Sequence, residues 1–430
     1  MVVSDGRCLR EHKGMGLVHE VFDAHHLRGL SGFVALGHVR YSTTGASTER
    51  NIQPFLGDSR LGSIAVAHNG NLVNTPSLWK KLSRRGAVVR SSTDTELILH
   101  LLAGSSFDSL EDSLKEALWE MRGAYSLGIL SRDKLIAVRD PWGFRPLCLG
   151  KLGSGYLVSS ESCAIEVVGG ELIREIAPGE MLIIDENGLR SFFYAYSSRK
   201  AFCVFELIYF ARPDTFVFGN HVAEARKRMG MVLAEDETFD ADMVVPVPDS
   251  GIFAALGFSE GSGIPLEFAM VRNPYVGRTF IQPGPESRNL AVRLKLNPLK
   301  ALLRGKRVII VEDSIVRGNT SRERIATLKE AGAKEVHLRV SAPPHRFPCY
   351  YGIDFPSSEE LIASRLALPE IEKYLGLDSL RYLSLEGLKR SIQPPTSAYC
   401  FACFDGVYPV DKDESLGKLC LEGQLETHRC

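Results

Sequence analysis

The chain has 430 residues, of which 44% are hydrophobic and 24% charged, and its 51 lysines and arginines nearly cancel 52 aspartates and glutamates. This balance excludes a global basic field for nucleic acid, and no apolar run reaches the length of a membrane span. The length predicts two domains, and the absence of an apolar signal core at the N-terminus favours a cytoplasmic protein.

The N-terminal half consists of short apolar runs separated by glycine, a texture typical of β-strands. We predict strands over residues 33–39, 61–67, 124–130 and 181–185. One helix is predicted over 95–102, where an apolar stripe follows Ser92-Thr93-Asp94. Together these elements predict sheet-on-sheet packing with a few covering helices.

From about residue 200 the strands become wholly apolar, as in the buried centre of a parallel sheet. Residues 243–247 and 307–311 are two such strands, and a helix over 320–331 leads from the second to a strand at 336–340. This strand–helix–strand order predicts a doubly wound α/β domain. Residues 357–360 read Ser-Ser-Glu-Glu, a capping box that predicts the start of another helix.

The most informative segment, residues 311–321, begins at the end of an apolar strand and runs into the predicted helix. Open α/β sheets bind ligands at this edge, where free N–H groups and the helix dipole favour a phosphate. Two adjacent carboxylates, Glu312 and Asp313, repel each other, so placing both at a strand end is unfavourable unless a cation or hydroxyl donors bind them. A ribose and a magnesium-bound pyrophosphate would supply both; the alternative is a solvated acidic turn.

This segment resembles the phosphoribosylpyrophosphate (PRPP) motif of type I phosphoribosyltransferases, and residues 314–318 resemble its amidotransferase version. The family usually has two aspartates where this chain has Glu312 and Asp313, and threonine where it has Asn319. The resemblance implies that Ser250, Glu312 and Asp313 surround a magnesium ion. It implies PRPP binding by these three residues and by Asp249, Arg278, Lys295, Ser314, Arg317, Gly318, Asn319 and Thr320.

Two further segments fit the same resemblance. Residues 247–251 follow the other apolar strand and resemble the family's pyrophosphate loop. Residues 272–283, with 295–298, resemble the loop that closes over PRPP. A closing loop is expected because the reaction builds an oxocarbenium-like ribose that water would trap.

In the N-terminal half, residues 37–45, 68–72 and 92–96 resemble the glutamine-binding motifs of class II glutamine amidotransferases, which are N-terminal-nucleophile hydrolases. The resemblance implies that Arg40 holds the α-carboxylate of glutamine and Asp94 its α-ammonium. Asn69 and Gly70 would form the oxyanion hole. Taken singly, Asn69-Gly70 also suits a hairpin turn, and Arg40 a surface ion pair.

The glutaminase chemistry of this family needs a cysteine as residue 1 of the mature chain, with its own α-amine as the base. Here residue 1 is Met1, and the internal Cys8 is interpreted as a bystander. We therefore expect an inactive glutaminase, with no catalytic residue for that half. The explanations are a start codon placed too far downstream, a fragment, or a natural ammonia-dependent enzyme; the retained glutamine-binding set favours the first two.

The sequence has nine cysteines, of which Cys400 and Cys403 form a C-x-x-C pair that indicates a metal. One interpretation adds Cys420 and Cys430 to give a zinc-ribbon-like tail. The family resemblance instead implies a [4Fe–4S] cluster on Cys203, Cys349, Cys400 and Cys403, with a structural or oxygen-sensing role, and we favour it. The remaining Cys148 and Cys163 are predicted to be core thiols.

Nearly the whole chain thus resembles the glutamine PRPP amidotransferases. The implied fold is an α+β N-terminal-nucleophile-hydrolase-like αββα domain over 1–195, without its first strand and nucleophile. An α/β type I phosphoribosyltransferase domain with a C-terminal cysteine segment follows over 196–430. The implied reaction joins ammonia, taken from glutamine in complete relatives, to C1 of PRPP, giving 5-phosphoribosylamine and pyrophosphate in the first committed step of purine biosynthesis.

The resemblance also implies a homo-oligomer with purine nucleotides as inhibitors. A rival hypothesis is a PRPP-binding regulatory protein without turnover, but no DNA-binding module or basic face is visible. Another rival is a sugar-phosphate or asparagine-forming amidotransferase; those enzymes lack the motif at 311–321.

Overall fold

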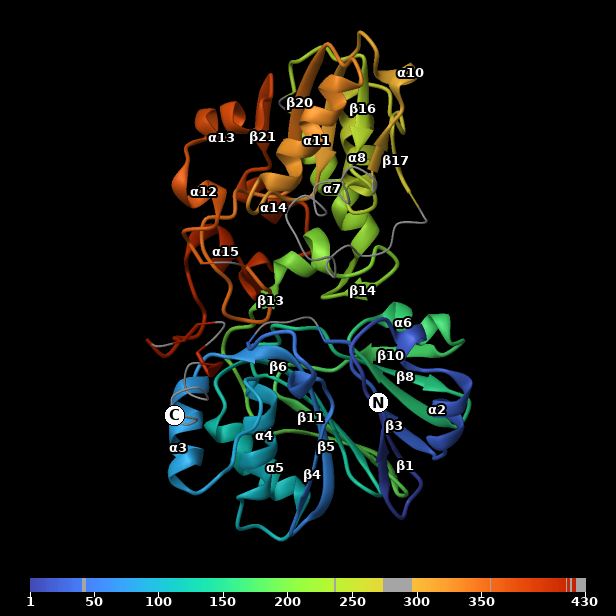
Figure 1. Ribbon diagram of the computed structural model, residues 1–430, viewed down its shortest axis with the longest axis vertical. Helices are drawn as coiled ribbons and strands as arrows, with labels where there is room; N and C mark the ends of the chain where they lie inside the picture. The colour runs from blue at the N-terminus through green and yellow to red at the C-terminus, as the bar shows by residue number, and fades with distance from the viewer. Residues whose placement is uncertain are drawn as a thin grey trace. The chain divides into compact units, whose positions relative to one another are not determined.

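The chain forms two compact units in the computed structural model (Figure 1). The structure describes residues 1–40, 44–235, 237–273, 296–355, 357–414, 416–417 and 420–422. The first unit comprises Met1–Phe202, Cys349–Asp354 and Tyr408–Cys430, and the second comprises Cys203–Pro348 and Phe355–Val407. The sequence suggested one boundary after residue 195 and gave no sign that two later segments group with the first unit.

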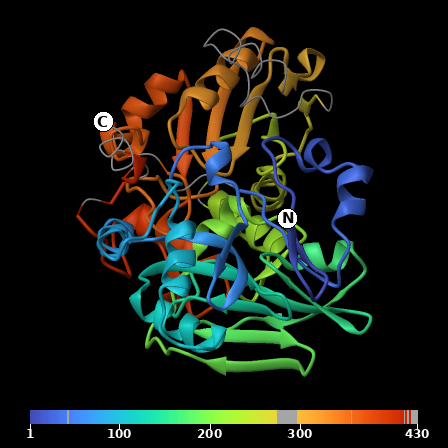
Figure 2. The same cartoon turned by 60° about the horizontal axis from the view of Figure 1, so that its bottom comes forward.

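The first unit is organised around a six-stranded antiparallel sheet in the order β12-β11-β7-β6-β5-β4 (Figures 1 and 2). Its strands are β4 (Phe55–Ser59), β5 (Gly62–Leu72), β6 (Gly123–Leu130), β7 (Leu135–Arg139), β11 (Glu180–Asp185) and β12 (Gly188–Phe193). The helices α3 (Thr75–Arg84), α4 (Asp94–Ala103) and α5 (Leu110–Glu120) share one apolar core with this sheet. The predicted strands at 61–67, 124–130 and 181–185 and the helix at 95–102 are therefore confirmed.

Alternation along β7 and β11 shows that both faces of this sheet are buried. Ile136 and Val138 join the core under α3, α4 and α5, whereas Ala137 and Leu182 belong to a second core with Leu149. That second core is covered by a sheet of β8 (Cys148–Leu152), β9 (Gly155–Ser159) and β10 (Glu171–Glu175). Successive side chains of a strand point to opposite faces of a sheet, so one set of residues faces the helices and the other faces the second sheet. The predicted sheet-on-sheet packing is therefore present.

A third sheet in this unit joins the ends of the N-terminal segment. It consists of β1 (Val2–Ser4), β2 (Leu9–Glu11) and β3 (Val34–Leu36). Val2 is fully buried against Ala65 and Leu130 of the main sheet. Strand β3 is shorter than the strand predicted over 33–39, and the small helices α1 (Val18–Val21), α2 (Ala24–Gly29) and α6 (Ser162–Val167) complete the unit.

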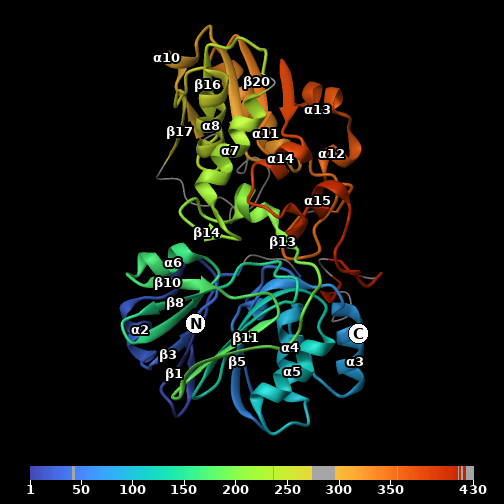
Figure 3. The ribbon, with the colours of Figure 1, turned by 180° about the vertical axis from the view of Figure 1, so that it is seen from behind.

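The second unit contains a parallel sheet in the order β16-β19-β20-β21. Its strands are β16 (Met243–Pro246), β19 (Arg307–Glu312), β20 (Glu335–Val340) and β21 (Ser379–Tyr382). Helices α11 (Asn319–Glu330) and α13 (Leu368–Leu375) share one apolar core with the sheet. Helices α7 (Val222–Ala234) and α8 (Ile252–Ser262) pack against each other, and α8 contacts β16 and β19 (Figure 3). The predicted strand–helix–strand unit is β19-α11-β20.

Shorter elements surround this sheet. They are the strands β13 (Phe202–Cys203), β14 (Phe216–Val217), β15 (Asn220–His221), β17 (Met270–Arg272), β18 (Leu296–Pro298) and β22 (Tyr399–Cys400) and the helices α10 (Lys300–Leu303), α12 (Ile362–Arg365), α14 (Leu385–Arg390) and α15 (Ala402–Asp405). Within the described part of the chain, no helix has the length and apolarity that crossing a membrane requires.

The predicted capping box at 357–360 is wrong. Helix α12 is four residues long and starts at Ile362, after a turn. The Glu360 carboxylate that should cap the helix instead forms an ion pair with Arg317 at 2.7 Å. A long-range partner has therefore replaced the local hydrogen bond that the sequence pattern suggested.

Candidate functional site

The loops after β16 and β19 lie at one edge of the parallel sheet. The two strands are parallel and in register, with Pro246 opposite Val311, so the loops that follow them start side by side at the same edge of the sheet. The Ser250 hydroxyl donates a short hydrogen bond to the Asp313 carboxylate. The fold therefore brings together two predicted ligand residues that are far apart in the sequence.

Asp313 is a buried carboxylate whose ionised form is only partly compensated. Its second oxygen accepts a short hydrogen bond from Ser314. Burial and then the neighbouring Glu312 raise the pKa of Asp313, while the two serine hydroxyls and Arg226 oppose that rise. Such a site gains most from a bound cation or hydroxyl donor.

Glu312 points in a different direction from Asp313. Its carboxylate accepts a hydrogen bond of 3.1 Å from Ser321 and forms a short ion pair with Arg324, both on α11. The structure thus pairs Ser250 with Asp313 and commits Glu312 to the helix. The predicted trio around one magnesium ion is not assembled by direct contacts among the three residues.

The helix α11 starts where the motif predicts a phosphate cradle. Gly318 precedes the helix with φ of 82°, and a Cβ there would lie 2.8 Å from the Ile362 Cδ1 atom, so only glycine fits well. Asn319 and Thr320 are exposed at the first turn, and the Asn319 side chain accepts a hydrogen bond of 2.9 Å from Tyr374. Exposed N–H groups at a helix start favour an anion.

Of the remaining predicted PRPP residues, two are described and form ion pairs, and two lie outside the described residues. Asp249 forms an exposed ion pair with Arg272 at 2.5 Å. Arg317 is held by Glu360, as described above. Arg278 and Lys295 lie outside the described residues.

The donor set of the site fits a magnesium ion that arrives with a phosphate ligand. Magnesium commonly binds proteins through one or two carboxylates together with substrate phosphates and water. The Asp313 carboxylate beside the Ser250 hydroxyl is such a set. Across the described ranges no group of three or more His, Cys, Asp or Glu side chains is arranged to hold a metal.

In the first unit, Asp94, one of the predicted glutamine-binding residues, forms a buried pair with His68. The His68 Nδ1 atom lies 3.4 Å from an Asp94 oxygen, and these side chains are 1% and 4% exposed. The other Asp94 oxygen accepts a hydrogen bond of 2.9 Å from the Leu72 N–H. The Asp94 carboxylate, expected to hold an ammonium group, already has two donors.

The pair has opposed pKa shifts. Burial alone would lower the pKa of His68, but the Asp94 carboxylate outweighs burial and raises it. Burial would raise the pKa of Asp94, but the charge and hydrogen bond of His68, the Leu72 N–H and the Arg40 charge together outweigh burial and lower it. Stability from the histidine is lost as the pH rises through its raised pKa, and stability from the aspartate is lost as the pH falls through its lowered pKa. The pair should stabilise the first unit most between these two values.

We expect Asp94→Asn to lower the free energy of unfolding of the first unit by about 2 kcal/mol near neutral pH, because a charged buried hydrogen bond is lost. Urea denaturation at several pH values would measure the change. Asp108→Asn is the matched control, since Asp108 is exposed and pairs with Arg60 at the surface, where such pairs contribute little. Equal losses in both variants, or a loss that persists unchanged above the pKa of His68, would contradict this interpretation.

Asn69 and Gly70 lie inside strand β5, so the alternative of a hairpin turn is excluded. Gly70 has φ of 149°, and a Cβ there would lie 2.1 Å from the Ala124 carbonyl oxygen, which explains the glycine. The Asn69 amide is 3.4 Å from the Ser160 hydroxyl. The backbone of the predicted oxyanion hole is thus held by the sheet, and the Asn69 side chain contacts Ser160.

Arg40 is not a surface ion pair. Its guanidinium donates to the carbonyls of Thr44, Gly45 and Ala46 at 2.8–3.1 Å. The carboxylate of Glu422 lies in the same region, where it accepts a hydrogen bond of 3.1 Å from the Ala46 N–H. The negative charges of Asp94 and Glu422 both favour the charged form of Arg40, although burial dominates and lowers its pKa.

Sequence reasoning missed His68, Arg324 and Glu422. His68 directly precedes the quoted Asn69-Gly70 pair, so its position was the available signal. Arg324 lies three residues after Ser321 on the predicted helix, on the same face. Glu422 has no local signal, because its partners Ser92 and Ala46 are more than 300 residues away in the sequence.

The cysteines of the predicted cluster are distributed over several elements, and within the described residues no three of them are arranged to hold a metal. Strand β13 pairs with β22, which brings the segments of Cys203 and Cys400 together, and Cys403 is in α15. Cys349 accepts a hydrogen bond of 3.4 Å from the Tyr351 N–H, and burial raises the pKa of its thiol. Cys430 lies outside the described residues. Cys148 and Cys163 are buried, as predicted for core thiols. Cys8 is exposed.

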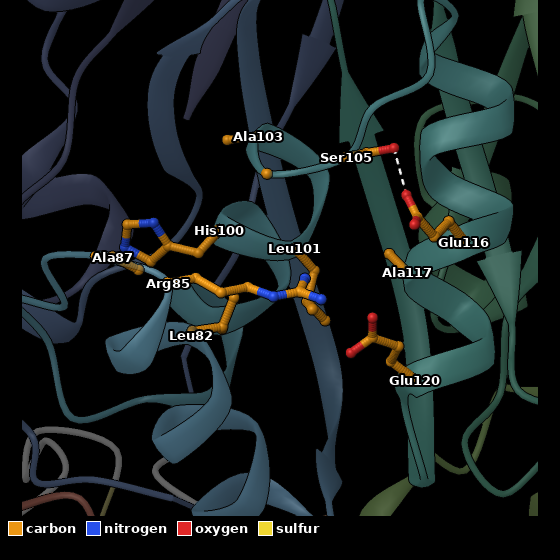
Figure 4. A pocket seen from close by; sticks show the side chains of 12 residues that line it. Leu82, Arg85, Ala87, His100, Leu101, Ala103, Ser105, Glu116, Ala117 and Glu120 are labelled. Atoms are coloured by element: carbon orange, nitrogen blue, oxygen red, sulfur yellow. Dashed lines mark hydrogen bonds between the residues drawn. The ribbon is translucent and has the colours of Figure 1, made fainter.

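A separate cavity of about 320 Å³ lies in the first unit, away from these motifs. It is lined by residues of α3, α4 and α5 and their connections, including Arg85, His100, Glu116 and Glu120 (Figure 4). Glu116 and Glu120 are engaged by Ser105 and Lys81 respectively. None of the residues predicted from the motifs lines this cavity.

Comparisons with known proteins agree with both halves of the sequence interpretation. Residues 38–167 match the family model of the glutamine amidotransferase domain. The amidophosphoribosyltransferase of Bacillus subtilis is 45% identical over 416 residues, covering 96% of this chain and 87% of the relative. That of Methanocaldococcus jannaschii is 46% identical over 428 residues, covering 96% and 90%, and a chloroplastic one of Arabidopsis thaliana is 46% identical over 415 residues, covering 96% and 73%.

Solved structures give the same result. The glutamine PRPP amidotransferase of B. subtilis complexed with ADP and GMP superposes with a TM-score of 0.90 at 44% identity, covering 97% of this chain and 92% of that one. A structure described as the allosteric regulatory enzyme of purine biosynthesis gives a TM-score of 0.92 at 44% identity, covering 98% and 92%. The expected fold class, an N-terminal-nucleophile-hydrolase-like domain followed by a phosphoribosyltransferase domain, is confirmed.

Proposed function

The chain belongs to the amidophosphoribosyltransferase family, and we propose that its second unit joins ammonia to C1 of PRPP with release of pyrophosphate. The observation that carries the proposal is the contact between Ser250 and Asp313 at adjacent strand ends, beside the start of α11. In the reaction the C1–oxygen bond to pyrophosphate breaks, and the electron pair leaves with that oxygen. The ammonia nitrogen bonds to C1 and releases one proton, giving 5-phosphoribosylamine.

Each part of this edge has a separate role in the proposal. The N–H groups at the start of α11 hold the 5-phosphate, because a helix start attracts an anion. Ser250 and Asp313 would hold a magnesium ion carried by the pyrophosphate, and that ion would neutralise charge on the leaving group. Glu312, on the neighbouring position of β19, accepts a hydrogen bond from a ribose hydroxyl.

The first unit is proposed to bind glutamine. Arg40 and Asp94 would recognise the α-carboxylate and α-ammonium, and Asn69 with Gly70 would form the oxyanion hole. Two observations support this subsite: the family match over residues 38–167 and the placement of Asn69 and Gly70 within β5.

The test is pyrophosphate release from PRPP and magnesium under anaerobic conditions, with ammonium or glutamine as the nitrogen source. Release with ammonium is the expected result, and Ser250→Ala should lower it. If the chain binds PRPP but releases no pyrophosphate with either source, the proposal is overturned in favour of a PRPP-binding regulatory protein. The glutamine reaction separately reports whether the first unit supplies ammonia.

We also propose a [4Fe–4S] cluster on Cys203, Cys349, Cys400 and Cys403. The pairing of β13 with β22 and the C-x-x-C spacing support the assignment, and four thiolates are the usual ligand set. After anaerobic reconstitution we expect about four iron ions per chain and strong loss of iron in Cys400→Ser and Cys403→Ser. Cys8→Ser is the control, since this exposed thiol should not affect the iron content. One tightly bound zinc ion and no iron would instead support the zinc alternative.

Purine nucleotides are proposed as inhibitors, and a homo-oligomer as the assembly. The B. subtilis relative is complexed with ADP and GMP, which motivates the first proposal. A rise in melting temperature with these nucleotides would support it. The plant relatives are described as chloroplastic, whereas those of B. subtilis and M. jannaschii carry no such description, and we propose a cytoplasmic location.

A further inference from the structure

The side chain of Glu312 is fixed by two residues of α11. Arg324 forms a short ion pair with one carboxylate oxygen, and Ser321 donates to the other at 3.1 Å. Ser321 and Arg324 are three residues apart on the helix and therefore share a face. Each carboxylate oxygen has two acceptor positions, so one position per oxygen stays available to a ligand.

This ion pair lies in a nearly dry environment. The side chains of Glu312 and Arg324 are 10% and 11% exposed, and the Arg324 Nε atom has no hydrogen-bond partner among the described residues. Next to the pair, burial and the Glu312 charge raise the pKa of Tyr382, whose buried hydroxyl has no partner within the described ranges. A buried carboxylate in such surroundings depends strongly on its counter-ion.

We propose that Arg324 is a positioning residue for PRPP binding, which holds the long Glu312 side chain so that its remaining acceptor positions meet a ribose hydroxyl. Where the family usually has aspartate, Glu312 has one additional methylene group and hence one additional rotatable bond. The Arg324 guanidinium fixes that bond and offsets one of the two adjacent negative charges. The inference rests on the proposed function, because it assigns the Glu312 carboxylate to the PRPP site.

The first experiment compares Arg324→Met with Arg322→Met. Both variants remove one positive charge from α11, but Arg322 is exposed and lies over the Tyr374 ring at 5.0 Å. By calorimetry with PRPP and magnesium, we expect the Kd of Arg324→Met to rise about 10- to 100-fold, as for other residues that orient a ligand-binding group. The KM for PRPP in the ammonium-dependent reaction should rise in parallel while kcat changes little. Arg322→Met should bind like the unsubstituted chain.

Two further variants keep the test decisive if Arg324→Met folds poorly. Arg324→Lys keeps the charge and should restore most of the affinity. In Glu312→Asp with Arg324→Met, the shorter carboxylate needs no anchor, so the double variant should bind PRPP more tightly than Arg324→Met alone. The proposal is overturned if Arg324→Met binds like Arg322→Met, or if Glu312→Asp gives no relief.

The outcomes also separate this inference from the proposed function. A chain that binds PRPP but releases no pyrophosphate contradicts the function, and the comparison of Arg324 variants by calorimetry remains valid. A chain that turns over PRPP with unchanged Kd and KM in Arg324→Met contradicts the inference alone. A chain that does not bind PRPP at all overturns both.

Discussion

Replacing Asp313 with asparagine is expected to abolish most of the ammonium-dependent pyrophosphate release while leaving the fold as stable as before, or more so. The substitution removes the carboxylate charge that is proposed to hold magnesium. Loss of one charged partner from a buried site costs about 2–5 kcal/mol of binding, which corresponds to a loss of about 30-fold to several thousand-fold. The loss should fall on kcat/KM for PRPP and on the dependence on magnesium. Steady-state kinetics across magnesium concentrations would measure it.

The stability prediction follows from the raised pKa of Asp313. Burial and the Glu312 charge favour its protonated form in the folded chain, so the folded state binds more protons than the unfolded state. Stability therefore falls as the pH rises from the ordinary carboxyl pKa through the raised value. Asparagine carries no charge at any of these pH values, so Asp313→Asn removes this cost and should show a flatter stability profile.

The matched control is Asp240→Asn, because Asp240 is an exposed acid of the same unit, paired with Arg307 at 3.2 Å. It removes the same charge but should change neither kinetics nor stability appreciably. If Asp313→Asn keeps its kcat/KM, or if it loses stability together with activity, Asp313 is a structural residue rather than a ligand for PRPP. A gain of stability with a loss of activity is the pattern expected of a functional site.

The architecture of the second unit follows from the sequence because its strands are locally unambiguous. Residues 308–311 are all apolar and precede two acids, and they form the buried part of strand β19. The strand–helix–strand order predicted a parallel pair, and β19 and β20 pair in this way around α11. The meeting of Ser250 and Asp313 was instead implied by the family resemblance, because several elements separate β16 from β19 in the chain. The strands of this sheet are buried, and a run of apolar residues in the sequence predicts buried strands directly.

The partners of charged side chains were less predictable than the strands, because a charged group can pair with any of several neighbours in the fold. The sequence suggested that Glu360 caps a helix, but its carboxylate pairs with Arg317. The resemblance implied a magnesium ion beside Glu312, and it gave no sign that Arg324 holds the Glu312 carboxylate. Asn69-Gly70 has the composition of a turn, yet cross-strand pairing keeps it extended in β5. For Glu360 and for Asn69-Gly70, a tertiary contact outweighed a local preference of about 1 kcal/mol.

The second large effect is expected where α7 and α8 cross. A Cβ on Gly257 would lie 1.9 Å from the Lys227 carbonyl oxygen, and a Cβ on Gly230 would lie 1.8 Å from that of Ala254. Backbone oxygens cannot move aside as a flexible side chain can, so either substitution must push the helices apart. Because α8 directly follows the loop that carries Ser250, the phosphoribosyl site should move with it.

We therefore expect Gly257→Ala to destabilise the second unit by about 3 kcal/mol or more, although alanine is the better helix former by about 1 kcal/mol. Because the chain has two units, the transition of the second unit is identified by its rise in melting temperature with PRPP and magnesium. Gly29→Ala in α2 is the control, since a Cβ there meets nothing within 4 Å and the substitution should be neutral or slightly stabilising. If Gly257→Ala, like the control, keeps the melting temperature and the PRPP affinity of the unsubstituted chain, the close helix crossing does not set the position of the Ser250 loop.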